Sequence, residues 1–506
     1  MPGCPAVAHP EDGMKNAWIA AVALVALLPA AAVAQDAKTV IASASKAMGA
    51  DGLNSIVVYG SGANFGLGQS NNANGEWPRT NLNDYVRAID FTTSSLRATA
   101  VTWAAPVTGP VAVQGPFQQN IGAAQGTSWA QQLNVWTTPW GFLKGAAANN
   151  PTVKAETVGG QRYQVVTWMT TQRSPGGPAY RVVGHISPRG LVDRVDTWLE
   201  DPVLGDMLVE NIYTEYRDAN GVMFPAKSVQ KRGGQATFEL QTLGIRANPD
   251  NIVALVTPPP PPAGRAGGPP PGGPGGPGAA AGPTSEKLAD GVFRINGAYN
   301  ALAVEFADHI LIFEPGPQNE ARSQAIIAEA RKVIPNKPVR YGVISHHHFD
   351  HTGGIANVVA EGITIVTPAV NKAFLDRALS APRTLVGDAL AKAPKKPIVE
   401  GFAGDKRVFS DATRTFEVHV IKGLPHADGL VVGYLPKEKL LVYADMFNLP
   451  PANGPQVPNP PVVGTGVFAD NIARLGLTPD RVMSVHSLNP DRLTSVAEIN
   501  ATLGRK

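Results

Sequence analysis

The chain has 506 residues, of which 43% are hydrophobic, so it is long enough to form more than one domain with a buried core. Its formal net charge of +3 is too small to indicate binding to nucleic acid or to an anionic membrane surface. The only cysteine is Cys4, which excludes a disulfide framework.

Residues 1–34 have the features of a leader and a secretory signal peptide. Lys15 precedes an apolar run over residues 17–28, and Ala32-Val33-Ala34 is a small-x-small cleavage pattern. The run is shorter than the roughly 20 apolar residues that a membrane span needs. We therefore expect cleavage after Ala34, a periplasmic or secreted location, and no integral membrane span in the mature protein. The alternative is an uncleaved N-terminal anchor.

Residues 35–257 are predicted to form an antiparallel β-rich α+β domain. A helical pattern over residues 39–48 is followed by strand-like runs such as 164–168 and 181–185, and Asp-Ala-Asn-Gly at 218–221 predicts a hairpin turn. All eight tryptophans precede residue 258, and we expect most of them in a core. The order helix, GADGLNSI, long meander and YRDANGVMFPAK resembles the periplasmic lipoprotein-carrier fold, a resemblance that carries no catalytic residue.

Residues 258–285 are predicted to be a linker. Pro and Gly dominate residues 258–283, and Arg265 is their only charged residue. Such a composition cannot bury enough apolar surface to offset the entropy lost on ordering. We expect a spacer between two folded parts.

In residues 286–506 the pattern of hydrophobic residues differs from that of the preceding part, and it predicts strands that alternate with helices. Strands are predicted at 291–296, 301–306, 339–345, 363–367, 415–421, 429–435 and 440–444, with helices at 320–333, at 353–360 and from 371 onward. This α/β pattern favours an αββα sandwich, with its functional residues at one edge between two sheets.

The segment His346-His347-His348-Phe349-Asp350-His351 contains four of the ten histidines in the chain. Its H-x-H-x-D-H spacing follows an apolar run and precedes Gly353-Gly354, which predicts a strand that ends in a ligand loop. Imidazole nitrogens and a carboxylate at this density suit zinc. The alternatives are an accidental histidine cluster, a tag-like tract or a solvated loop.

This segment resembles the signature of the metallo-β-lactamase-fold superfamily. Further candidate ligands follow in the order of that family: His426, then Asp445 at the end of an apolar strand, then His486 after another apolar run. The resemblance implies a C-terminal metallo-β-lactamase αββα sandwich with two Zn²⁺ ions, iron or manganese being alternatives. It assigns to one metal His346, His348 and His426, to the other Asp350, His351 and His486, and places Asp445 as the bridge. Asp350 is also expected to take part in catalysis, with a bridging hydroxide as the nucleophile.

Four other histidines and one glutamate are not part of this ligand set. His347 is expected in an outer shell or in packing, and His185, His309 and His419 on the surface or on strands, because no motif surrounds them. Glu314 stands where the family has an Asp that supports the metal loop by hydrogen bonds, so the resemblance does not predict how the ligands are supported at that point. The alternative is that Glu314 is an ordinary solvated turn residue. Without a cysteine in the mature chain, β-lactamase subclasses with a cysteine ligand are excluded.

The function predicted from these patterns is that of an exported, dinuclear, zinc-dependent hydrolase. Its small-molecule substrate would be an ester, lactone, thioester, amide or phosphoester, since the ligand pattern does not fix the substrate class. One alternative is an iron-dependent oxidoreductase of the same fold, and another is a protein that binds an apolar ligand through its N-terminal domain. β-Lactam cleavage is a subsidiary alternative. The oligomeric state is not predicted, and the Pro/Gly-rich loop 449–467 is expected to contribute to specificity.

Overall fold

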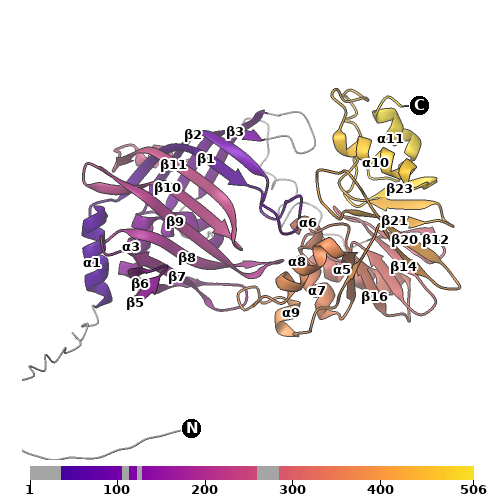
Figure 1. Ribbon diagram of the computed structural model, residues 1–506, viewed down its shortest axis with the longest axis horizontal. Coiled ribbons are helices and arrows are strands. Elements are labelled where there is room, and N and C mark those ends of the chain that lie inside the picture. The colour runs from indigo at the N-terminus through magenta and orange to yellow at the C-terminus, as the bar shows by residue number, and fades with distance from the viewer. Residues whose placement is uncertain (1–35, 105–112, 122–127, 259–283, 506) are drawn as a thin grey trace, which may run out of the picture. The chain divides into compact units, whose positions relative to one another are not determined.

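The computed structural model describes residues 36–104, 113–121, 128–258 and 284–505 (Figure 1). The predicted signal peptide and nearly all of the predicted linker lie outside these residues. Within the described part of the chain, no helix has the length and apolar character needed to cross a membrane.

The first part of the chain forms one antiparallel sheet with the strand order β4-β3-β2-β1-β11-β10-β9-β8-β7-β6-β5. Almost every strand pairs with its neighbour in sequence, while β1 also pairs with β11. The strands are β1 Ser55–Phe65, β2 Arg79–Asp90, β3 Ser95–Ala104, β4 Val113–Ile121, β5 Thr152–Val158, β6 Gln161–Arg173, β7 Ala179–Ile186, β8 Val192–Asp201, β9 Gly205–Ala219, β10 Val222–Arg232 and β11 Gln235–Ala247.

The hairpin predicted at residues 218–221 joins β9 to β10. Asn220 has φ 54° and Gly221 has φ 83°, so both central residues of the turn lie in the left-handed region. A two-residue hairpin turn of this kind requires positive φ at both positions, which Asn-Gly supplies at low cost. The local sequence therefore explains this turn.

Helices pack against this sheet, and only the first of them was predicted from the sequence. They are α1 Ala37–Met48, α2 Trp129–Trp136, α3 Pro139–Ala148 and α4 Ile252–Val256. Helix α1 buries Val40, Ile41, Ala44 and Met48, which recur at helical spacing, and it ends at Gly49 with φ 63°. Three tryptophans of the core, Trp129, Trp140 and Trp168, are each 3% exposed, which agrees with the core role expected for most of these residues.

The second part of the chain forms two sheets. The seven-stranded sheet has the order β12-β13-β14-β15-β16-β17-β18, and the five-stranded sheet has the order β19-β20-β21-β22-β23. Their strands are β12 Ser285–Ala289, β13 Val292–Ile295, β14 Ala301–Glu305, β15 Ile310–Phe313, β16 Val339–Val343, β17 Thr364–Pro368, β18 Val399–Phe402, β19 Lys406–Ser410, β20 Thr415–Val420, β21 Val431–Leu435, β22 Leu440–Tyr443 and β23 Arg481–Ser484.

An apolar layer joins these two sheets face to face. Residues of both sheets share one buried cluster, in which the rings of Phe313 and Phe416 lie 6.4 Å apart edge to face. Two further clusters pack helices on the outer faces of the sheets. The helices are α5 Glu320–Val333, α6 Phe349–Thr352, α7 Ile355–Ala360, α8 Ala369–Leu379, α9 Ala389–Lys392, α10 Val463–Arg474 and α11 Val496–Thr502, of which α5, α7 and α8 are orange and α10 and α11 yellow in Figure 1.

The αββα sandwich is therefore confirmed, as is the antiparallel β-rich sheet that precedes it. Helix α5 begins and ends at the predicted residues, since Asn319 caps it and Arg331 and Lys332 lie in its last turn. Some details differ from the prediction, and strands β18 and β19 and helix α11 were not predicted. Strand β12 begins at Ser285, inside the predicted linker, and α10 occupies the end of the segment 449–467 that was expected to be a loop.

Candidate metal centre

The seven candidate ligands all lie where a strand gives way to a loop or a short helix. His346 and His348 follow β16, and Asp350 and His351 lie in the short helix α6. His426 lies between β20 and β21, while Asp445 follows β22 and His486 follows β23. Buried strands fix the backbone up to these positions, and the loops allow the side chains to converge.

The structure brings these seven side chains together into three overlapping groups. In each group, the possible ligand atoms lie within 4.8 Å of one another. The groups are His346, His348 and His426; His346, His351 and Asp445; and Asp350, His351 and His486. The first and third match the two sets that the family resemblance assigns to separate metals, and the second links them.

Asp445 is the residue that links the two sets. One carboxylate oxygen, Oδ1, lies 2.6 Å from His486 Nε2, and the other, Oδ2, lies 2.9 Å from His351 Nε2 and 3.3 Å from His346 Nε2. Asp445 adopts φ 57°, which is uncommon for a residue with a side chain and is often found at functional sites. Asp445 therefore lies between the two sets of candidate ligands.

The residues of the cluster differ in their exposure: three form a buried floor, and three form a partly exposed, open face. His346, His348 and His351 are at most 1% exposed. The side chains of His426, His486 and Asp350 are 23%, 30% and 34% exposed. A small molecule can therefore approach the cluster from the side of these three residues.

The three buried histidines differ in their pKa values and therefore in their protonation. Burial lowers the pKa of His346 well below its usual value and that of His348 to about 3, so both rings are neutral at pH 7 and can bind a metal. Burial also acts to lower the pKa of His351, but the carboxylates of Asp445 and Glu314 outweigh it and raise that pKa well above the usual value. For Asp445, burial is likewise outweighed by His351, which holds the pKa of the carboxyl well below its usual value.

Three buried polar atoms test whether these residues fit a metal ion. Nε2 of His346, Nε2 of His426 and Oδ2 of Asp445 are buried and make no well-aligned hydrogen bond within the described residues, although Oδ2 lies 2.9 Å from Nε2 of His351. A buried polar group without a partner costs about 1–3 kcal/mol, so three at one place require an explanation. Nitrogen and oxygen atoms that converge in this way fit a divalent metal such as zinc.

Glu314 takes over the supporting role that the family gives to an Asp. It lies at the end of β15, is fully buried, and adopts φ 63°. Its Oε2 lies 2.9 Å from Nδ1 of His351, and its Oε1 accepts a hydrogen bond from the backbone N–H of Ser345. The Nδ1–H of His351 donates to the carboxylate and leaves Nε2 for a metal, so the longer side chain orients this ligand.

Three residues of the site carried no recognisable sequence pattern: Tyr299, Gln69 and Ser70. The Tyr299 hydroxyl donates to Asp350 Oδ2 at 2.9 Å, and its ring centroid lies 4.3 Å from that of His486. Gln69 and Ser70 come from the loop between β1 and β2. Gln69 Nε2 donates to Asp350 Oδ1 at 2.9 Å, and the Ser70 carbonyl accepts from the rings of His347 and His348 at 2.8 and 2.9 Å.

The other histidines in the described chain lie outside the three groups. His347 is 1% exposed and packs beside Phe374, which agrees with its predicted packing or outer-shell role. His185 lies on β7, His419 on β20, and His309 immediately before β15. All three are buried, at 4–9% exposure, so they are strand-associated rather than surface residues. His9 lies outside the described residues.

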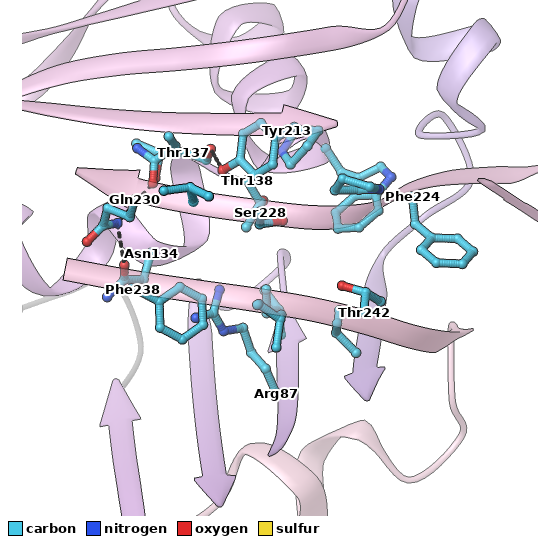
Figure 2. Close-up of a pocket in the computed structure, with 18 residues that line it drawn as sticks. Arg87, Asn134, Thr137, Thr138, Tyr213, Phe224, Ser228, Gln230, Phe238 and Thr242 are labelled. Carbon is cyan, nitrogen blue, oxygen red and sulfur yellow. Dashed lines mark hydrogen bonds between the residues drawn. The ribbon is translucent and has the colours of Figure 1, made fainter. Parts of the chain in front are cut away.

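A separate cavity lies in the first part of the chain, between the sheet and the segment with α2 and α3 (Figure 2). Arg87 and Phe238 line it from the sheet, and Gln230 donates to Asn134 across it at 3.4 Å. Its volume is about 50 Å³, whereas sites for small organic ligands usually measure about 300–1,000 Å³. This cavity has room for a few water molecules, so it gives no support to binding of an apolar ligand here.

Comparisons with known proteins identify the second part of the chain. Residues 295–456 match the family model of the metallo-β-lactamase superfamily. This part of the chain is a metallo-β-lactamase-superfamily domain. The match includes every candidate ligand except His486, which follows it in sequence.

The chain is also similar to solved metallo-β-lactamases. Those from Pontibacter korlensis, Hirschia baltica and Erythrobacter litoralis are each 17% identical to it, with TM-scores of 0.33, 0.32 and 0.32. Each comparison covers 44% of this chain, and 97%, 97% and 95% of the respective structures. A comparison with curated protein sequences gives no match.

Proposed function

We propose that this protein is an exported hydrolase whose metallo-β-lactamase domain binds two zinc ions, with iron or manganese as alternatives. One observation carries the proposal. Three buried ligand atoms, those of His346, His426 and Asp445, converge and make no well-aligned hydrogen bond within the described residues. A metal ion would satisfy all three atoms at once, and the overlapping groups around Asp445 offer ligands for a second ion.

Each of the two ions would be held by its own set of side chains. His346, His348 and His426 would hold one, Asp350, His351 and His486 the other, and Asp445 would contact both. When bound, the ions supply a nucleophile near neutral pH by lowering the pKa of a coordinated water molecule. Asp350 has its partly exposed carboxylate on the open face, where Tyr299 and Gln69 hold it by hydrogen bonds. This position lets Asp350 both bind metal and orient the attacking group in catalysis.

The substrate class follows from this chemistry only in outline. An ester, lactone, thioester, amide or phosphoester presents a carbon or phosphorus centre that such a nucleophile attacks. β-Lactams are amides of this kind, and the solved structures named above are metallo-β-lactamases. An exported location rests on residues 1–34, which carry the signal-peptide pattern.

The experiment is to measure metal content and hydrolysis on the same full-length preparations. We expect about two zinc ions per chain after zinc loading, and hydrolysis of at least one ester, lactone, thioester, amide, β-lactam or phosphoester probe. Activity should disappear with a chelator and return with zinc. His348→Ala should lose metal, whereas His185→Ala, which changes a buried strand histidine elsewhere, should not. A protein that binds no metal after zinc loading, or that hydrolyses none of these probes with zinc, iron or manganese, would overturn the proposal. Activity that returns only with iron or manganese would replace zinc by that alternative.

A further inference from the structure

The loop between β1 and β2, residues 66–78, contacts the metal-ligand segments although it belongs to the first sheet. It is a hairpin connection, because Phe65 pairs with Arg79 across its base. Hairpin connections usually have two to five residues, and longer loops are often functional. The contacts of this loop indicate what it does.

The loop contacts two of the segments that carry candidate ligands. In the H-x-H-x-D-H segment, Gln69 Nε2 donates to Asp350 Oδ1 at 2.9 Å, and the Ser70 carbonyl accepts from His348 Nε2 at 2.9 Å. In the segment around His426, Asn71 Nδ2 donates to the Pro425 carbonyl at 2.9 Å. The backbone N–H of Asp428 donates to the Asn71 carbonyl at 2.6 Å.

These hydrogen bonds decide which ligand atoms are free. A carbonyl oxygen can only accept, so Nε2 of His348 carries the hydrogen and Nδ1 is left as the nitrogen that can bind a metal. Gln69 holds one oxygen of Asp350 and Tyr299 the other, which fixes the plane of the carboxylate. Partners of this kind orient metal ligands, and their loss typically costs 10–100-fold in metal affinity or activity.

Packing holds the loop in place independently of these hydrogen bonds. Gly68 adopts φ 72°, and a Cβ atom at this position would lie 2.1 Å from the Phe349 ring. Its carbonyl accepts from the backbone N–H of Phe349 at 3.3 Å. Ala73 is 8% exposed and belongs to the buried cluster of the metallo-β-lactamase domain. The loop is therefore built into that domain.

We propose that the first sheet completes the metal centre through this loop, with Gln69 as a positioning residue for Asp350 and the Ser70 carbonyl as the acceptor that orients His348. The inference rests on the proposed function, since it assumes that these side chains bind metal. It gives the N-terminal part of the chain a direct role in the site. The metallo-β-lactamase domain would lack part of its ligand support without it.

The test measures metal affinity on full-length variants by competition with a chromophoric chelator, together with the absorption spectrum of the cobalt-loaded protein. Gln69→Leu keeps the size of the side chain and removes its donor. We expect it to weaken the binding of one of the two metals by 10–100-fold, to leave the other within about 2-fold, and to change the cobalt spectrum. Gln161→Leu, at an exposed glutamine at the start of β6, is the control and should match the wild type.

A second variant tests the packing of the loop. Gly68→Ala should also weaken metal binding, because the new methyl group pushes the loop away from Phe349. Its control is Gly160→Ala, where φ is 81° and nothing lies within 4 Å of the added atom, so it carries the backbone cost alone. Circular dichroism should show all variants folded, and Gln69→Leu decides the test if Gly68→Ala does not fold.

The outcomes separate the two proposals. If the wild type binds two metals and Gln69→Leu binds them as tightly as Gln161→Leu, the positioning role is overturned while the proposed function stands. If the wild type binds no metal, the proposed function fails and this inference falls with it. Selective weakening of one metal in Gln69→Leu supports both.

Discussion

Glu314→Gln tests how far the metal centre depends on a carboxylate that binds no metal itself. Glu314 is fully buried, and its two oxygens accept hydrogen bonds from Ser345 N–H and His351 Nδ1–H. An amide of the same shape keeps one acceptor oxygen, and its NH₂ group cannot accept. One of the two donors must therefore lose its partner inside the protein.

The expected magnitude follows from these two bonds. A hydrogen bond to a charged group contributes about 1.5–3 kcal/mol, so we expect metal-free Glu314→Gln to lose about 2 kcal/mol of the free energy of unfolding. If His351 is the residue that loses its partner, the same energy corresponds to about 30-fold weaker metal binding, at about 1.4 kcal/mol per factor of ten. That value lies within the range known for partners of metal ligands.

Two assays on one set of proteins test this estimate. Urea denaturation with a chelator present gives the free energy of unfolding, and competition with a chromophoric chelator gives the metal dissociation constants. Glu361→Gln is the matched control, because Glu361 forms an exposed ion pair with Arg331, and such pairs contribute about 0–1 kcal/mol. Wild-type stability together with wild-type metal affinity in Glu314→Gln would refute the argument.

The remaining predictions concern the bridge, export and the linker. Asp445→Asn removes a negative charge shared by both ligand sets, so turnover should fall by at least about 100-fold with loss of one or both metals; full metal content with wild-type turnover would contradict the bridging role. His348→Ala should instead weaken one metal selectively, as measured by elemental analysis after dialysis. Intact-mass measurement of exported protein should give an N-terminus at Gln35, and retention of residues 1–34 would count against a signal peptide. Mild proteolysis should cut between Thr257 and Ser285 and leave two resistant fragments, whereas an uncut chain under those conditions would argue against a linker.

The sequence alone determined the features that depend on neighbouring residues. The H-x-H-x-D-H spacing lies within six residues, so one loop after one strand brings four of the candidate ligands close together. Helix α5 and the turn at Asn220-Gly221 follow from capping and from the backbone preferences of those two residues. The order of the later candidate ligands is what the family resemblance implied, and two of them, Asp445 and His486, each follow an apolar run that predicts a buried strand.

Only the tertiary structure decided which distant residues support these ligands. Gln69 lies 281 residues from Asp350, and Glu314 lies 37 residues from His351. Gln69 has no motif around it, because a single hydrogen bond to a distant residue imposes no pattern on its neighbours in sequence. Glu314 stands where the family resemblance implies a supporting Asp, but only the structure shows that it contacts His351. The size of the cavity in the first sheet was equally hidden, since it depends on how side chains of several strands and helices fill one space. Local spacing explains why the candidate ligands at residues 346–351 lie close together. Contacts between segments far apart in the sequence determine how those side chains are oriented.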